Sequence, residues 1–261
     1  YAPHVATVFL AACATKVSLY VLLRFDFYVF QPNLEAHDLR FSYFLLPLSL
    51  LAILIASAVA MFERDLKRLL AWSSVAQIGY IMLGASLVSI AGLTASLLHV
   101  FNHALAKGAL FLAVMAIAMR YNRLDLQHLA GAAKHMPWTL SALVVAGLSL
   151  IGVPGTAGFI SKWYLVTAAL DEGGLGIALV AVIVVGSLMA VVYIWRIVEA
   201  AWFEPDDYSA TGPAGTVRAA PVTMLAVVWL AALANIYFGL ATGLPRELAT
   251  RAAISLLGHL P

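Results

Sequence analysis

Hydrophobic residues run along this chain in long blocks that contain few polar positions. Blocks of about 20 residues or more with few or no charges are long enough to cross the hydrocarbon core of a bilayer as helices. Seven blocks meet this criterion: 2–23, 42–61, 69–90, 93–119, 136–170, 175–195 and 220–240. The pattern therefore predicts an all-α, polytopic membrane protein with a single membrane domain. A shorter and more polar tail, 246–260, is predicted to lie along the membrane interface.

The fifth block is too long for one straight span. As a continuous helix its 35 residues would extend about 52 Å, against a hydrocarbon core of roughly 30 Å. Its centre contains the helix-breaking residues Gly152, Pro154, Gly155 and Gly158. We expect one span made of two half-helices with an unwound hinge at 152–155, and a simple proline kink is the alternative. Transporters place ion sites at such breaks.

The composition supports the membrane assignment and excludes several other classes. Of the 261 residues, 63% are apolar and 11% are charged, whereas soluble domains contain about 25% charged residues. The net charge of +2 gives no footprint for nucleic acid. The single cysteine, Cys13, excludes a disulfide framework and a four-cysteine metal site. The chain starts at Tyr1 inside an apolar stretch, so we expect it to be a piece of a longer protein.

Basic residues in the connections predict an orientation. The connections after the second, fourth and sixth blocks contain eight Lys or Arg residues, and the opposite side contains four. Positively charged connections stay on the cytoplasmic side. The first set is therefore predicted to be cytoplasmic, and we expect the protein to lie in the inner (plasma) membrane of a bacterial cell.

Three lysines lie well inside predicted spans: Lys16, Lys107 and Lys162. A charged side chain at the centre of a bilayer costs roughly 2.5–3.5 kcal/mol on insertion scales. No Asp or Glu lies deep in any span, so carboxylates of this chain cannot neutralise all three. Burial away from counter-ions favours the neutral amine, which can then gain and lose a proton. Snorkelling of the ammonium groups to the interface is the structural alternative.

The fourth block adds two histidines to this set. His99, His103 and Lys107 are spaced at i, i+4 and i+8, so they share one helix face. Imidazole both donates and accepts protons near physiological pH, and this face therefore suits a proton relay. Hydrogen bonding between packed helices is one alternative. A metal site is disfavoured because no third ligand is evident beside the two histidines. A retinal-binding protein is disfavoured because the spans contain no carboxylate counter-ion and the last span contains no lysine.

Four segments resemble one superfamily of membrane subunits. The stretch from Asp65 to Tyr80, DLKRLLAWSSVAQIGY, is similar to the signature DxKRLLAYSSVSQxGY of antiporter-like subunits. The stretches 103–112 and 152–162 resemble the motifs HAxxKxxLFL and GxPxxxGFxxK, and 14–24 resembles the span after the first broken helix of the family. These subunits include the L, M and N subunits of respiratory complex I and the A and D subunits of Mrp-type sodium/proton antiporters. Of these, the Mrp-type D protein looks closer in the details of its motifs than the complex I proteins.

The resemblance implies a subunit of fourteen helices that contains two inverted five-helix repeats. This chain would be its C-terminal half and would contain the second repeat, with about seven transmembrane helices. By the same resemblance, Lys16 matches the central lysine of the family. His99, His103 and Lys107 match its polar relay helix, and Lys162 matches the lysine on its second broken helix.

These features lead to three functional hypotheses. The first is proton translocation in a multisubunit Na⁺/proton antiporter, and the second is a proton-pumping membrane-arm subunit of an NADH:quinone oxidoreductase or a related hydrogenase complex. The third is a passive membrane scaffold. The chain contains no motif for a nucleotide, flavin or iron–sulfur cluster. We therefore expect no cofactor or metal in it, and other membrane subunits, lipid, protons and Na⁺ as its partners.

Overall fold

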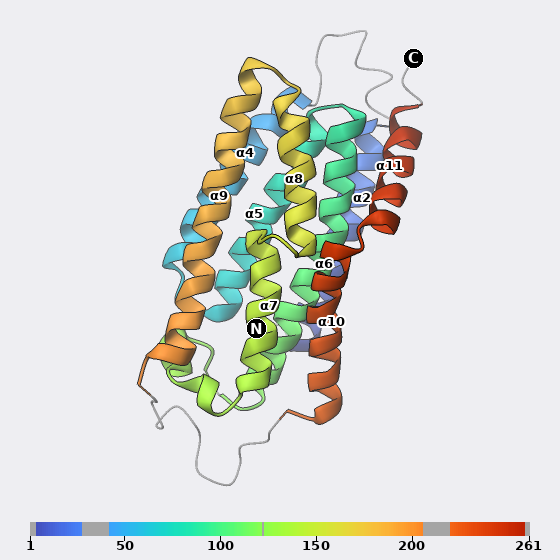
Figure 1. Cartoon of the computed structure of the whole chain (residues 1–261). Helices are drawn as coiled ribbons and strands as arrows, with labels where there is room; N and C mark the ends of the chain where they lie inside the picture. The colour runs from blue at the N-terminus through green and yellow to red at the C-terminus, as the bar shows by residue number, and fades with distance from the viewer. Residues whose placement is uncertain (1–3, 28–41, 122, 206–219, 259–261) are drawn as a thin grey trace.

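The fold was determined as a computed structural model, which describes residues 4–27, 42–121, 123–205 and 220–258. Within these ranges the chain is helical, apart from connections and one isolated backbone bridge between Asp65 and Asp125. Figure 1 shows the helices as one elongated bundle. The predicted all-α membrane fold is confirmed.

Among the described residues, six helices are long and apolar enough to cross a membrane. The first span is built from α1 (His4–Phe9), a π-helical turn η1 (Leu10–Ala14) and α2 (Thr15–Phe25). The others are α4 (Ser42–Phe62), α5 (Leu66–Ser86), α6 (Ile90–Ala118), α9 (Gly174–Val198) with its π-helical extension η6 (Glu199–Phe203), and α10 (Val222–Leu240).

The long fifth block forms a discontinuous span. Its halves are α7 (Pro137–Ile151) and α8 (Ala157–Leu170), which are stacked end to end in Figure 1. Gly152 ends α7 in the left-handed region with φ of 92°, a conformation that glycine adopts without a steric penalty. At Gly158, a Cβ atom would lie 1.8 Å from the Ser149 carbonyl oxygen. The two half-helices can therefore approach this closely only with glycine at 158.

A second interruption follows α10. The chain breaks at 241–242 and continues as α11 (Gly243–Leu257), which runs beside α6 (Figure 1). This packing differs from the interfacial tail expected for 246–260. Ala253 is buried against Leu93 of α6, and small side chains allow such close helix contact. The end of α10 also packs against the first break, because a Cβ atom on Gly239 would lie 2.5 Å from the Gly155 carbonyl oxygen.

Helix α6 is the centre of the bundle. It contacts α5, α7, α8, α10 and α11, and also the π-helical turn of the first span. The largest apolar cluster surrounds its C-terminal half, where Leu110, Val114 and Ile117 are buried. Most side chains on this helix are therefore enclosed by protein.

The connections after α4, α6 and α9 lie at the same end of the bundle (Figure 1), as the alternation of spans requires. Two polar side chains organise this end. Asp65 caps α5 by accepting a hydrogen bond from the Arg68 backbone N–H at 2.9 Å. The guanidinium group of Arg196 donates to the carbonyl oxygens of Met61 and Glu63, where α4 ends. The side of the membrane that this end faces stays a prediction.

Asp26 follows the first span and is a buried carboxyl group. Its side chain is 2% exposed, and its Oδ1 has no hydrogen-bond partner among the described residues. Burial raises the pKa of Asp26 from the ordinary 3.8 to about 6. Because the folded-state pKa exceeds the unfolded one, the folded state loses stability as the pH rises between these two values. The loss persists at higher pH.

We therefore expect Asp26→Asn to raise the melting temperature of the detergent-solubilised protein at pH 7.5. The gain should disappear below about pH 4, where the aspartate is neutral in both states. Asp171→Asn, at an exposed position, is the control and should melt like the wild type. A gain of equal size at both pH values would contradict this account of Asp26.

Candidate functional site

The five titratable residues singled out in the sequence are all buried. His99, His103 and Lys107 lie on one face of α6, Lys16 lies at the start of α2, and Lys162 lies on α8. Lys16 is the most exposed of them, at 7%, and Lys107 is fully buried. We call this set, together with the polar side chains that contact it, the polar axis.

Lys107 is bound by α5. Its Nζ donates to the Leu70 carbonyl oxygen at 2.7 Å and to the Ser73 hydroxyl oxygen. The Ser73 hydroxyl also lies 2.9 Å from the same Leu70 oxygen. The ring of Phe111 faces the ammonium group, with its centroid 5.9 Å from Nζ. The amine is thus held by neutral acceptors only.

His99 joins three helices. Its Nδ1 lies 2.8 Å from Ser161 Oγ on α8, and its Nε2 lies 2.9 Å from Gln77 Oε1 on α5. Because Gln77 Oε1 can only accept, Nε2 must carry a proton in this arrangement. In the neutral imidazole, Nδ1 then accepts from the Ser161 hydroxyl. The neighbouring Asn102 donates to the Ala157 carbonyl oxygen at 2.6 Å, which fixes α6 to the first turn of α8.

Lys162 satisfies carbonyl groups that the helix break leaves free. Its Nζ donates to the carbonyl oxygens of Leu150 and Ile151, at 3.1 and 2.9 Å, in the last turn of α7. It also lies 3.0 Å from the Ser187 hydroxyl oxygen on α9. The Tyr80 ring covers the ammonium group, with 4.5 Å between Nζ and the ring centroid. The helix break therefore supplies the carbonyl oxygens that bind the ammonium group of Lys162.

Lys16 follows the π-helical turn in the first span. Its Nζ donates to the Ala11 carbonyl oxygen, which lies in that turn, and to Thr15 Oγ1 at 3.2 Å. Thr15 Oγ1 itself lies 3.3 Å from the Ala11 oxygen. Single π-turns often mark functional positions, since they alter the regular pattern of backbone hydrogen bonds.

His103 differs from the other members of the polar axis. It is buried, yet neither ring nitrogen has a hydrogen-bond partner among the described residues. Its ring stacks on that of His99, with 6.3 Å between the centroids. Lys16, Lys107, His99 and Lys162 all lie near enough to interact with it electrostatically. A buried imidazole with both nitrogens free requires a water molecule or a rearranged neighbour.

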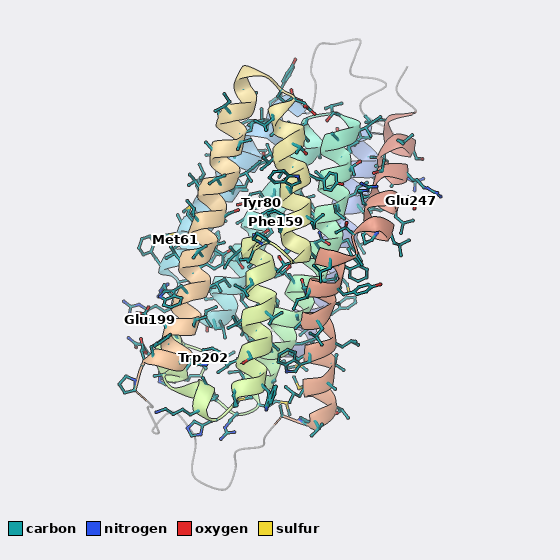
Figure 2. All side chains as sticks on the ribbon, in the orientation of Figure 1. Met61, Tyr80, Phe159, Glu199, Trp202 and Glu247 are labelled. Carbon is teal, nitrogen blue, oxygen red and sulfur yellow. The ribbon has the colours of Figure 1, made fainter. Side chains whose placement is uncertain are left out.

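The sequence prediction did not include several members of the polar axis. Helix α5 contributes Ser73, Gln77 and Tyr80, which share one face at i, i+4 and i+7. Figure 2 shows Tyr80 level with the first turn of α8, where Phe159 lies. Tyr193 of α9 is also buried, and its hydroxyl has no hydrogen-bond partner among the described residues. The spacing on α5 was visible in the quoted signature, but nothing local indicated that this face meets the lysines.

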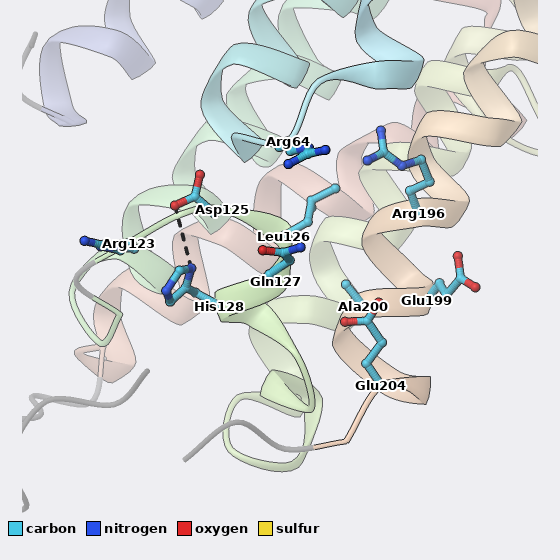
Figure 3. A pocket seen from close by; sticks show the side chains of 10 residues that line it. All are labelled: Arg64, Arg123, Asp125, Leu126, Gln127, His128, Arg196, Glu199, Ala200 and Glu204. Atoms are coloured by element: carbon cyan, nitrogen blue, oxygen red, sulfur yellow. Dashed lines mark ion pairs between the residues drawn. The ribbon is translucent and has the colours of Figure 1, made fainter. Parts of the chain in front are cut away.

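A second polar cluster lies at the end of the bundle that carries the basic connections (Figure 3). It surrounds a cavity of about 470 Å³. The lining combines three arginines with three carboxylates, namely Arg64, Arg123, Arg196, Asp125, Glu199 and Glu204. The lining contains none of the five titratable residues of the polar axis, and the lining residue Leu126 belongs to the buried apolar core together with Leu66 and Leu69. The cavity is therefore separate from the polar axis.

The described residues contain no group of three His, Cys, Asp or Glu side chains that could hold a metal ion. Within the same ranges, no carboxylate lies within ion-pairing distance of Lys16, Lys107 or Lys162. What remains is a file of proton-accepting groups held by hydroxyl, amide and carbonyl groups. The fold and the polar axis together define a polytopic membrane protein with a discontinuous span and a buried lysine and histidine file.

The sequence identifies the family. The chain matches the family model described as "NADH:quinone oxidoreductase/Mrp antiporter, TM" over residues 1–190, and it belongs to this family. It is 40% identical over 210 residues to "NADH-quinone oxidoreductase subunit N" of Desulforudis audaxviator, which covers 78% of this chain and 40% of that protein. It is 38% identical over 125 residues to "Hydrogenase-4 component B" of Escherichia coli, covering 44% of this chain and 19% of that protein.

Solved structures show the same fold. A subunit in the "Structure of Mrp complex from Dietzia sp. DQ12-45-1b" superposes with a TM-score of 0.84 at 27% identity, covering 96% of this chain and 53% of that one. A chain of respiratory complex I from Thermus thermophilus with bound aureothin superposes with a TM-score of 0.64 at 26% identity, covering 78% of this chain and 45% of that chain. The chain thus spans about half the length of these relatives.

Proposed function

We propose that this chain forms the second half of a proton-translocating membrane subunit, with the polar axis as its proton path. The observation that supports this most directly is that, among the described residues, three buried amines and the His99 imidazole are hydrogen-bonded to neutral partners, and the buried His103 imidazole has no hydrogen-bond partner. A permanent charge without a counter-ion is costly in such surroundings. Groups that alternate between charged and neutral forms avoid that cost for part of each cycle.

The path we propose runs from Lys16 through His103 to Lys107 and His99, and then to Lys162. His103 stacks on His99 and lies one helical turn from Lys107 on α6, and its ring nitrogens, which lack partners among the described residues, suit it to pass protons. The Tyr80 ring separates the last two groups, with its centroid 5.7 Å from that of His99 and 4.5 Å from Lys162 Nζ. Transfer past Tyr80 requires a bridging water molecule or a side-chain movement.

For the host assembly, we propose the membrane arm of an NADH-quinone oxidoreductase-like complex, because the chain is 40% identical to a subunit N. In that assembly the chain performs no redox chemistry itself. A monovalent cation/proton antiporter is the second candidate, which the TM-score of 0.84 with the Mrp complex favours. We propose a bacterial plasma membrane as its location. Purification of the native complex separates the two, since it should carry either NADH-dependent quinone reduction or Na⁺-dependent proton exchange.

The test of the proton path is Lys162→Ala in the full-length subunit within its complex. We expect proton transport into inverted membrane vesicles to fall at least tenfold, because an essential proton-binding group is removed. Thr167→Ala is a control on the same helix, since that hydroxyl is exposed and contacts only the Tyr164 carbonyl oxygen. Normal assembly with normal transport in Lys162→Ala would reject the path and favour a passive scaffold.

A further inference from the structure

Each hydrogen-bonded base of the polar axis contacts one hydroxyl group. Lys16 contacts Thr15, Lys107 contacts Ser73, His99 contacts Ser161, and Lys162 contacts Ser187. The hydroxyls come from four different helices, α2, α5, α8 and α9. Within the described residues, His103 is the exception, because both of its ring nitrogens lack a partner.

Three of these hydroxyls also have a second acceptor within hydrogen-bond distance. Thr15 Oγ1 lies 3.3 Å from the Ala11 oxygen, and Ser73 Oγ lies 2.9 Å from the Leu70 oxygen. Ser161 Oγ lies 3.2 Å from the Gly158 oxygen. Ser187 has an electrostatic interaction with the Tyr80 hydroxyl, and that hydroxyl donates to the Ile183 oxygen at 3.3 Å.

A hydroxyl in this position can serve both protonation states of its partner. It has one proton to donate and lone pairs with which to accept. Beside a protonated base, the oxygen accepts from the base and the O–H turns to the second acceptor. Beside a neutral base, the O–H turns to the free lone pair on nitrogen. A carbonyl oxygen can fill only the first of these roles.

We propose that Thr15, Ser73, Ser161 and Ser187 act as rotating hydroxyl switches that keep each base of the polar axis hydrogen-bonded both with and without its proton. They are positioning residues, and the inference rests on the proposed proton path. No covalent bond changes at the switch, since only the O–H direction reverses. The switch lowers the cost of moving a proton, because neither state leaves a buried nitrogen unsatisfied.

Ser73 offers the sharpest test, because its neighbour Ser74 is a matched control. Both hydroxyls bind the Leu70 carbonyl oxygen, at 2.9 and 3.1 Å, and of these two only Ser73 contacts Lys107. In the full-length complex, we expect Ser73→Ala to reduce proton transport about tenfold, the effect of one lost hydrogen bond to a charged group. Ser74→Ala should transport like the wild type.

The pH profile separates a switch from simple packing. Among the described residues, the titratable groups that interact electrostatically with Lys107 are Lys16 and His103. Hydrogen bonds to the charged amine are about twice as strong as those to the neutral amine. Ser73→Ala should therefore move the half-maximal pH of transport to a lower value, and Ser74→Ala should not move it.

Ser187 provides an independent variant if Ser73→Ala fails to assemble. Ser187 is only half-buried, so Ser187→Thr has room for its methyl group. Ser187→Ala should lose transport about tenfold, and Ser187→Thr should restore most of it because it retains the hydroxyl. Wild-type rates and pH profiles in both alanine variants would overturn the switch. If Lys162→Ala also transported normally, the proton path itself would fail, whereas loss in Lys162→Ala alone would reject only the switch.

Discussion

Replacing Lys107 by methionine is expected to abolish proton transport while the protein remains folded. Lys107 is fully buried on α6, and within the described residues its ammonium group forms hydrogen bonds to the Leu70 carbonyl oxygen and the Ser73 hydroxyl. Methionine has a similar length and fills the same space without a charge. After the substitution Ser73 still donates to the Leu70 oxygen at 2.9 Å, so no buried donor is left unpaired.

Lys107→Met should therefore affect proton transport strongly and the melting temperature little. Transport should fall by about 100-fold or more, in the range lost when a proton-transfer group is removed. The melting temperature in detergent should stay equal or rise, because removing a buried charge also removes its desolvation cost. Transport is measured in inverted vesicles that contain the full-length complex.

Lys134→Met is the control for Lys107→Met, since Lys134 is exposed in the connection between α6 and α7. It should leave both transport and melting temperature unchanged. Undiminished transport in Lys107→Met would remove this residue from the path. A large drop in melting temperature would show that the amine is a structural group.

The second large effect is expected at the helix break, from Gly158→Ala. An added Cβ atom would lie 1.8 Å from the Ser149 carbonyl oxygen, so α7 and α8 would have to separate. The separation would also displace the carbonyl oxygens of Leu150 and Ile151 that bind Lys162. We expect a loss of about 3 kcal/mol or more in stability, at the upper end of overpacking effects, together with loss of transport.

Two other glycines calibrate this prediction. Gly108 lies inside α6, and a Cβ atom added there would lie 3.9 Å from its nearest neighbour, so Gly108→Ala should be neutral or slightly stabilising. Gly155 has a φ of 88° and open space around it, so Gly155→Ala should cost only the backbone strain of about 1–2 kcal/mol. Thermal unfolding in detergent should give the lowest melting temperature for Gly158→Ala, a higher one for Gly155→Ala and the highest for Gly108→Ala. A melting temperature for Gly158→Ala within one or two degrees of the wild type would contradict the packing at the break.

Much of the fold could be predicted from hydrophobic block lengths. Six spans follow directly, because each exceeds the thickness of the hydrocarbon core, and the glycines and proline around 152–158 predicted the discontinuous seventh. The last block was expected to end at 240, before Gly243 and Pro245, but the packing of the following segment against α6 was not expected. The position of the end of α10 beside Gly155 is a tertiary contact that no local signal records.

The candidate site divides in the same way. A charge or an imidazole stands out in an apolar span, so Lys16, His99, His103, Lys107 and Lys162 could be identified from sequence, and all five are buried. Serine and threonine occur on many membrane helices without a special role, so Thr15, Ser73, Ser161 and Ser187 could not. The proton-relay role of the five titratable residues and the switching role of the four hydroxyl residues stay predictions.

By itself, the sequence determined which residues are expensive to bury and where the backbone must break, because both costs belong to single residues. The tertiary structure alone decided which neutral groups hold the lysines, because Leu70 and Ser187 lie on other spans, 37 and 25 residues from the lysines that they contact. The physical reason is that a hydrogen bond depends on distances of a few tenths of an ångström between atoms. Helix packing sets such distances, and the pattern of residues along the chain does not.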